Sequence, residues 1–543
     1  MAKRSRRSRR TEAPPAPRTP PERPSAAWTV LILVAAIAAA FLERILFSRA
    51  WGETGSLTSR FYYGDANRLV DYATAITQGR TFDNGIPFHP PGWPLLLAAV
   101  LRLTGAAHDQ AMPVPITAVK LLLASSSALA VGMTAALAFE VAGLWAMVAV
   151  SLLGAFHFGH VVEGTVANSE ALYGLCVAGF MWSSWRWLCE RASQRRTRWA
   201  ILTGVIGGAA TLVRAEFVTA AVVLGVAAWR ARRERGVTTS RTIASRVLAG
   251  GVAAFAAAFV LMLTPTTVWH RRTLSAFNAA HVGQTGRSRL AGPLPTFAPV
   301  TSYGPFNFAM ANHADADGGP NRDHPMLDRC DPETEASLSG GQLDLRCDAA
   351  YELYVSGYGI GAAWLVEEPR QAVKLMSRKI AYTIDFLAHG YLIDDVGAGV
   401  EGVRRRVDML DPGAGWLLPI HIVLGIAGVM VLKRRPPALI VTLAPLVALS
   451  GSILGFYGYV RLGAAYMPVF WILQGAAAAA PASRFESARR LPPPKVISAA
   501  VVTMAIVLSY EFVRLDSPRT LHLDGPRDRA GRVVQDETVY LRR

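Results

Sequence analysis

Residues 28–47 read WTVLILVAAIAAAFLERILF, an apolar run whose only charges are Glu43 and Arg44 near its end. A run of about 20 apolar residues is long enough to cross the hydrocarbon core of a bilayer as a helix. Similar runs recur near 115–138, 143–160, 169–188, 199–213, 216–230, 246–269, 414–432, 437–456, 462–478 and 495–512. The sequence therefore predicts an all-α polytopic membrane protein with about eleven transmembrane helices.

The composition agrees with a chain that lies largely in a membrane. Of the 543 residues, 52% are hydrophobic and 17% are charged, whereas a soluble domain carries about 25% charged residues. No Walker-type GxxxxGK[ST] or GxSxG motif is present. The sequence thus gives no sign of nucleotide hydrolysis or of a serine hydrolase.

The loop charges predict the orientation of the helices. When the eleven runs alternate across a membrane, one side receives the segments MAKRSRRSRR, ERASQRRTR, WRARRERGVTTSRTIASR, KRRPP and SRFESARR. Cytoplasmic loops carry an excess of Lys and Arg, so this side and the N-terminus are predicted to be cytoplasmic. The net charge of +17 is then explained mostly by these basic cytoplasmic segments. The basic tail is expected to face lipid head groups, not nucleic acid.

Five segments follow from this topology. Residues 1–27 are predicted to be a disordered basic cytoplasmic tail. The run at 28–47 is expected to be a membrane anchor that is not cleaved as a signal peptide. Residues 28–269 form an N-terminal transmembrane module with an outer loop at 48–114, and 270–413 form an extracytoplasmic loop or lid. Residues 414–512 form the C-terminal transmembrane helices, and 513–543 an extracytoplasmic tail. Cys330 and Cys347 share the 270–413 loop, whose compartment permits oxidation, and a disulfide between them is predicted.

The first outer loop contains a polar island that is a candidate for chemistry. In YYGDANRLVDYATAITQG, apolar residues recur at helical spacing and predict an interfacial amphipathic helix with Asp65 at its start. Asp65 is either a helix N-cap or a functional carboxylate. In FHPPGWPLLL, two prolines fix an extended turn before a short apolar helix. His89 at that turn has the chemistry to donate a hydrogen bond to an anion.

Further polar residues lie at the predicted outer ends of the helices. His157, His160 and Glu163 are three residues apart and are metal-ligand candidates, although they match no established zinc motif. Glu170 opens a helix, where an acid also favours the helix dipole. Arg214, next to Glu216, and Arg461 carry guanidinium groups suited to phosphate, with snorkelling towards the interface as the alternative.

The order of these motifs resembles the C-type (GT-C) membrane glycosyltransferases, in the branch of protein O-mannosyltransferases and aminoarabinose transferases. The similar pieces are Asp65 in YYGDA, His89 in HPP, Glu170 in NSEALY, Arg214 and Glu216 in LVRAE, and Arg461 in VRLGAAYMP. In the long loop, TSYGPFNFAMANHADADGG and EEPRQAVKLMSRK, which contains Lys379, are also similar. Two departures are that Ala66 follows Asp65, where many members have Glu, and that LVRAE lacks a proline.

This resemblance implies a GT-C-like fold in a plasma (inner) membrane and a polyprenyl-phosphate-linked sugar as donor. The acceptor, at the extracytoplasmic face, would be a protein, lipid or glycan. Asp65 would be catalytic. His89, Glu170, Arg214, Arg461 and Lys379 would bind substrate, with a divalent metal possible. The alternatives are a transporter or flippase for a polar lipid or anion, and a structural membrane subunit. A transporter of the inverted-repeat type predicts charges near the midplane and internal repeats, whereas the candidate charges here cluster at outer boundaries.

Reporter fusions test the predicted orientation. A fusion after residue 27 should report the cytoplasm, and fusions within 270–413 and 513–543 should both report the extracytoplasmic side. Reporters in the last two segments that lie on opposite sides would contradict the eleven-helix topology.

Overall fold

The computed structural model describes residues 26–51, 66–79, 86–105, 116–190, 192–235, 243–285, 290–319, 324–330, 345, 347–388, 417–458 and 460–485. These residues form helices and their connections, and the β contact among them is an isolated bridge between Val282 and Leu290. Among them, three helices are long and apolar enough to cross a membrane: Thr117–Ala142, Gly250–His281 and Pro436–Gly455. The predicted all-α class is confirmed for this part of the chain.

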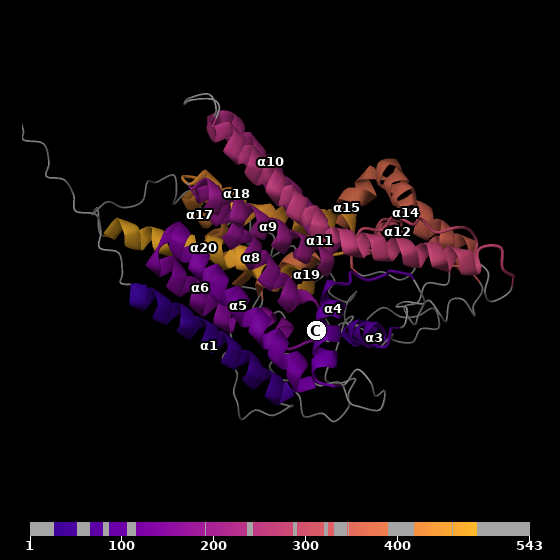
Figure 1. The fold of residues 1–543 in the computed structure, drawn as a ribbon, viewed down its shortest axis with the longest axis horizontal. Coiled ribbons are helices and arrows are strands. Elements are labelled where there is room, and N and C mark those ends of the chain that lie inside the picture. Colours follow the sequence, from indigo (N-terminus) through magenta and orange to yellow (C-terminus); the bar gives the residue numbers. More distant parts are fainter. Residues whose placement is uncertain are drawn as a thin grey trace, which may run out of the picture.

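Helices lie at each predicted apolar run up to residue 478, and Figure 1 shows them as one bundle. They are α1 (Ala26–Trp51), α5 (Ile116–Ala142), α6 (Leu144–Phe156), α8 (Glu170–Cys189), α9 (Ser193–Val213), α10 (Val218–Arg235), α11 (Ile243–His281), α17 (Leu417–Leu432), α18 (Pro436–Gly455) and α20 (Met467–Phe485). The run at 495–512 and the predicted tails lie outside the described residues. The count of eleven membrane-spanning helices stays a prediction.

Several helices differ from their predicted bounds, and two of these differences affect how the chain continues. The run at 143–160 breaks at His157, whose backbone is extended, and the chain continues as the short helix α7 (Phe158–Glu163). In contrast, α11 continues past residue 269, where the outer loop was predicted to begin, and ends at His281. Its last turns pack on residues 290–388, which belong to the predicted extracytoplasmic loop and are called the outer segment below. Leu274 is buried there, and the side chain of Asn278 hydrogen-bonds the backbone N–H and C=O of Leu294, both at 2.8 Å.

The outer segment forms a small helical unit with its own core. It comprises α12 (Gly304–Ala311), η4 (Pro325–Arg329), α14 (Asp348–Glu367), α15 (Pro369–Ile384) and η5 (Asp385–Ala388). Figure 1 shows α12, α14 and the end of α11 at the side of the bundle where α3 and α4 also lie. The core includes Leu294, Phe306, Leu327 and Leu353, together with Ile86 from the first outer loop.

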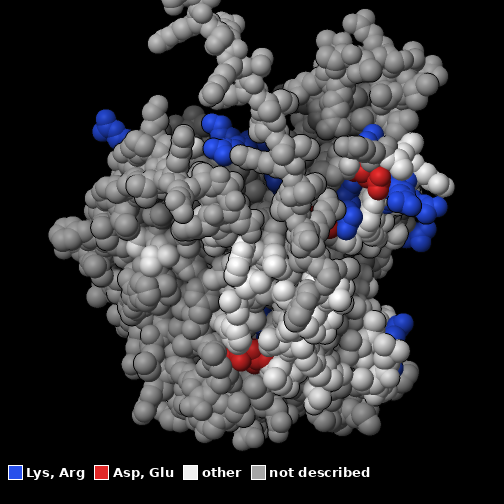
Figure 2. Space-filling view, turned by 90° about the vertical axis from the view of Figure 1, so that its left-hand side faces the viewer, with Lys and Arg blue, Asp and Glu red and all other residues white. Residues whose placement is uncertain are grey.

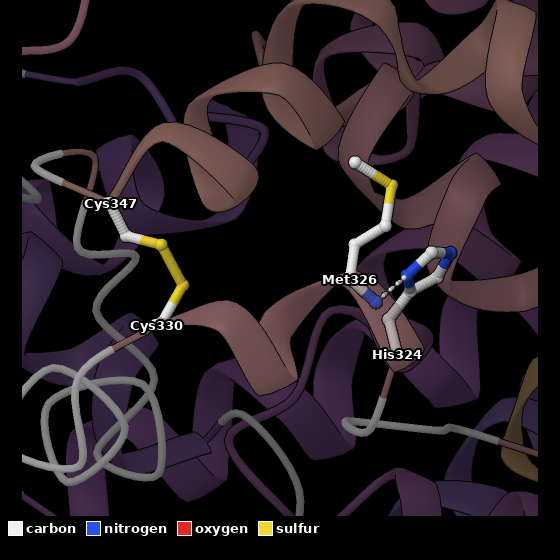
Figure 3. The surroundings of a disulfide bond; sticks show 4 residues. All are labelled: His324, Met326, Cys330 and Cys347. Atoms are coloured by element: carbon white, nitrogen blue, oxygen red, sulfur yellow. Dashed lines mark hydrogen bonds between the residues drawn. A yellow bond between two sulfur atoms is a disulfide. The ribbon is translucent and has the colours of Figure 1, made fainter.

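A disulfide closes this unit. Cys330 follows η4 and Cys347 precedes α14, and the two are bonded with their Cα atoms 5.6 Å apart (Figure 3). On the other side of η4, Nδ1 of His324 accepts a hydrogen bond of 3.2 Å from the backbone N–H of Met326 (Figure 3). Both ends of this short helix are therefore fixed.

The first outer loop contributes two helices, α3 (Ala66–Thr77) and α4 (Gly92–Leu103). The helix expected after Asp65 is thus present, and Leu69, Tyr72 and Ala73 on its apolar face are buried. That face was predicted to lie in the membrane interface, but it packs on α4 and on the connection between α7 and α8. The difference arises because α4 presents apolar residues such as Leu97 that cover the same face.

The opposite end of the bundle is rich in basic side chains. There the ends of α5 and α8 meet the turn between α17 and α18: Arg186 pairs with Glu140 at 2.6 Å, and Arg435 donates to the carbonyl oxygen of Val141 at 2.6 Å. Figure 2 faces the left-hand end of the molecule in Figure 1, and Lys and Arg colour more of its described surface than Asp and Glu. This is the end that the loop charges predict to be cytoplasmic.

Small residues allow helices of the bundle to approach closely, as is common in membrane proteins. At Gly428 of α17, an added Cβ would overlap the backbone of Leu473 on α20, whereas at Gly425, one turn earlier, it would meet nothing within 4 Å. We expect Gly428→Ala to destabilise the protein by about 1–3 kcal/mol, the usual cost of overpacking. Gly425→Ala should be neutral or slightly stabilising, because alanine favours helix. Thermal unfolding in detergent checks both, and equal midpoints for the two variants would contradict the close contact.

Candidate functional site

The turn that carries His89 is held by the outer segment. The backbone N–H of Ser302 donates to the carbonyl oxygen of Pro87 at 2.9 Å, and the hydroxyl of Thr301 donates to that of Phe88. The ring of Tyr303 packs on the ring of Phe88, with centroids 3.5 Å apart. His89 itself is partly exposed and begins the Pro90–Pro91 turn into α4. The outer segment therefore fixes the backbone immediately before His89.

An ion-pair cluster lies where α8 begins and α9 ends. Arg214 follows the last residue of α9, and its guanidinium group donates to Glu170 at 3.0 Å and to Glu216 at 2.8 Å. The side chains of Arg214, Glu170 and Glu216 are 12%, 3% and 15% exposed. Charges with so little water around them must be paired. The break at LVRAE that divides two predicted helices is thus also the place where Arg214 bridges two carboxylates.

The His89 turn and the ion-pair cluster are brought together by α4. An added Cβ at Gly92 would lie 2.8 Å from the backbone of Leu212 and Val213, which directly precede Arg214. The indole N–H of Trp93 donates to the carbonyl oxygen of Ala167 at 2.8 Å, three residues before Glu170. The His89 turn, the start of α8 at Glu170 and the end of α9 at Arg214 are far apart in the sequence. These contacts therefore bring them together at the same end of the bundle.

The helix that carries Arg461 lies at this end as well. This helix, α19 (Val460–Ala464), contacts α7, α8 and α15. Beside it, an added Cβ at Gly458 would overlap the carbonyl group of Lys379, and one at Gly463 would overlap the ring of Phe386. Glycine at these two positions lets the end of the outer segment pack directly on α19.

Lys379 is buried in the structure. Its ammonium group donates to Oδ1 of Asn312 at 2.8 Å, and the amide N–H of Asn312 donates to the carbonyl oxygen of Gly455 at 2.9 Å. Lys379 thus joins α15 to α12 and to the end of α18, and its role in binding substrate stays a prediction. Burial lowers the pKa of Lys379 from its usual 10.5 to about 7.

The three metal-ligand candidates take different roles. His160 accepts a hydrogen bond at Nδ1 from Arg44 at 2.8 Å, and Nδ1 of His157 accepts from the backbone N–H of His160 at 3.3 Å. Glu163 is buried at the end of α7. Among the described residues, no group of three His, Cys, Asp or Glu side chains is arranged to hold a metal ion.

Arg44 is a residue that sequence reasoning did not select. It is completely buried and donates to Ser127 Oγ at 2.5 Å, to the carbonyl oxygens of Ala40, Gly154 and Ala155 at 2.7, 3.1 and 3.2 Å, and to His160. These bonds use all the N–H groups of a guanidinium. The signal was the charge inside the first apolar run, because a charged residue in a membrane helix is a functional candidate by default.

Asp65, the predicted catalytic residue, lies outside the described residues. The next residue, Ala66, begins α3, whose first turns carry the buried Leu69 and Val70. These two residues belong to the same core as Trp93 and Ala167. The chain immediately after Asp65 is therefore anchored beside the connection that leads to Glu170.

No protein family and no curated protein matches the sequence. Among solved structures, the archaeal oligosaccharyltransferase AglB from Archaeoglobus fulgidus, in complex with an inhibitory peptide and a dolichol-phosphate, aligns with TM-score 0.44 and 15% identity over 89% of this chain and 56% of that chain. The Archaeoglobus fulgidus oligosaccharyltransferase in complex with Zn and sulfate aligns with TM-score 0.46 and 14% identity over 88% and 51%. ArnT from Cupriavidus metallidurans bound to undecaprenyl phosphate aligns with TM-score 0.33 and 14% identity over 85% and 80%. The chain spans about half the length of the oligosaccharyltransferases. At TM-scores below 0.5, the likeness carries no inference on its own.

The buried Lys379 predicts a pH dependence of stability. Between pH 7 and 10.5 the amine is protonated in the unfolded chain and largely neutral in the folded protein, so unfolding takes up a proton and stability rises with pH. Lys379→Met should remove this contribution, which is at most about 1.4 kcal/mol per pH unit. Lys374→Met, at an exposed position of the same helix, should keep the wild-type slope. Thermal unfolding midpoints from pH 7 to 10 measure the difference, and parallel slopes for wild type and Lys379→Met would contradict the lowered pKa.

Proposed function

We propose that this protein is a membrane glycosyltransferase that moves a sugar from a polyprenyl-phosphate donor to an acceptor at the extracytoplasmic face. The observation that carries the proposal is the meeting of the His89 turn, Glu170, Arg214 and α19 at one end of the bundle. The sequence motifs that resemble GT-C glycosyltransferases lie on these same elements. Their convergence in space is independent of their order in the chain.

The chemistry of the cluster suits a lipid-phosphate donor. Transfer from such a donor needs cations that stabilise the departing phosphate, and a base or carboxylate that orients the acceptor hydroxyl. Arg214 offers a guanidinium held in place by two carboxylates, and Arg461 on α19 supplies a second one. A fixed guanidinium costs little reorganisation when phosphate charge develops. The isoprenoid tail would remain in the membrane beside the bundle while the head group reaches these arginines.

Asp65 is the proposed base, or the carboxylate that orients the acceptor. It directly precedes α3, and α3 shares a core with Trp93, which follows the His89 turn. This arrangement supports a place for Asp65 near the other candidates. A carboxylate beside cationic groups stays ionised, which suits it to accept a proton or a hydrogen bond from a hydroxyl.

A transporter or flippase for a polar lipid or anion is the second candidate. It would place ionised groups near the middle of the membrane, where a substrate crosses. The described ion pairs Glu170–Arg214 and Glu216–Arg214 lie at one end of the bundle, and Glu140–Arg186 lies at the other. This distribution favours chemistry at a surface over passage through the bundle.

The direct test uses purified protein in lipid nanodiscs with a panel of polyprenyl-phosphate sugars. Release of free polyprenyl phosphate, followed by mass spectrometry, should appear with at least one donor once an acceptor fraction from the cell envelope is added. Movement of an intact polyprenyl-phosphate sugar across vesicles that contain the protein, without release of the sugar, would support the transporter instead.

Asp65→Asn is the sharpest test of the mechanism. Loss of a positioned base costs about 10²–10⁴-fold in rate, and the amide keeps the shape of the side chain, so the variant should still fold and insert. Asp71→Asn, at an exposed position of α3, is the matched control and should retain wild-type activity. Initial rates of polyprenyl-phosphate release measure both. Full activity in Asp65→Asn would exclude the proposed role for this carboxylate.

A further inference from the structure

Two buried tyrosines connect the helix that begins with Glu170 to the segment that carries Arg461. Tyr173 lies one turn after Glu170 on α8, and Tyr466 lies between α19 and α20. Their hydroxyl oxygens are 2.7 Å apart, and both residues are completely buried. The rings meet edge to face, with centroids 5.4 Å apart. A hydrogen bond therefore spans two elements that are 293 residues apart in the chain.

Two residues in the first turns of α8, Glu170 and Tyr173, also contact Arg214. The guanidinium carbon of Arg214 lies 5.6 Å from the centre of the Tyr173 ring, within the range of a cation–π contact. Glu170, three residues earlier, accepts from Arg214 at 3.0 Å. Tyr173 thus contacts Arg214 through its ring and the turn after α19 through its hydroxyl, so it links the two arginine-bearing segments.

The backbones on either side of this hydrogen bond are also close. An added Cβ at Gly174 would lie 3.5 Å from the carbonyl oxygen of Ala465, the residue before Tyr466. A buried hydroxyl that has lost its partner is costly where water is excluded. Each tyrosine therefore favours the one spacing of α8 and α19 at which the other hydroxyl is within reach. Two phenylalanines would fill the same space without that requirement.

We infer that Tyr173 and Tyr466 are positioning residues for the donor phosphate, and that their hydrogen bond sets the position of α19, the helix that carries Arg461, relative to Arg214. The inference rests on the proposed function and adds a structural element to it. The tyrosines act on the donor only through the arginines that they hold in place. The phosphate of the donor is charged before and after transfer, so these arginines contribute to donor binding as well as to turnover. Misplacing one arginine should therefore weaken donor binding, while an acceptor that carries no phosphate should bind as before.

The test compares Tyr173→Phe, Tyr466→Phe and the double variant in nanodiscs. Each single variant should raise the KM for the donor by about 2- to 10-fold, the range expected for losing one neutral hydrogen bond. The double variant should raise it no further, because both substitutions remove the same bond. The KM for the acceptor should stay at the wild-type value in all three. Additive effects of the two substitutions, or equal changes in both KM values, would overturn the inference.

A control at the other end of α8 separates positioning from general destabilisation. Trp185 donates from Nε1 to Glu140 at 2.9 Å, and Trp185→Phe removes that bond at the end of α8 opposite to Glu170 and Arg214. This variant should lower the thermal midpoint without changing the donor KM. A donor KM that rises in Trp185→Phe as much as in the tyrosine variants would show that any weakening of α8 has this effect, and would overturn the inference.

Amide hydrogen exchange gives a second measurement that needs no turnover. Exchange in residues 460–466 should increase in both single variants and reach the same level in the double variant; unchanged exchange would overturn the inference. Failure of the inference is distinguishable from failure of the proposed function. A wild-type protein that releases polyprenyl phosphate from no donor contradicts the function, whereas an active protein with the same donor KM in all three variants contradicts only the role of the tyrosines.

Discussion

Where a helix breaks among apolar neighbours, its last carbonyl groups must find donors within the protein, and Arg44 supplies them here. α6 ends at Phe156, and the carbonyl oxygens of Gly154 and Ala155 accept from the guanidinium group of Arg44 on α1. An unsatisfied carbonyl in a membrane costs several kcal/mol. In the same way, a buried guanidinium is stable only when its donors are used. The break in α6 and the charge in α1 therefore stabilise each other.

The position of the candidate site follows from that break. Because the chain leaves α6 at His157, the short helix α7 and residues 164–169 return to meet α4, where Trp93 binds the carbonyl oxygen of Ala167. This connection delivers Glu170 to the start of α8, within reach of Arg214 at the end of α9. A continuous helix through 143–160 would have carried the chain straight on. The ion pair of Glu170 and Arg214 thus depends on a hydrogen-bond network formed by α1, α5 and α6.

Hydrophobic runs and proline positions predicted the helices because they are local properties of the chain. The runs up to residue 478 appear as helices, and the Pro90–Pro91 turn leads into the short helix α4. Glu170 and Arg214 could be selected one at a time, since each is a charge beside an apolar run. Their pairing could not be predicted, because it depends on how α8 and α9 pack, 44 residues apart. The burial of Lys379 was equally hidden: its partner Asn312 lies 67 residues away on another helix, and nothing in the sequence around Lys379 distinguishes it from an exposed lysine.

The outer segment is held to the bundle by polar contacts as well as by its core. At one side, Thr301 and Ser302 bind the backbone before His89. At the other, Lys379 binds Asn312, and Asn312 binds the end of α18 at Gly455. The first attachment lies at the turn into α4, and the second lies beside Gly458, just before α19. Any movement of the outer segment away from the bundle would therefore have to break these bonds.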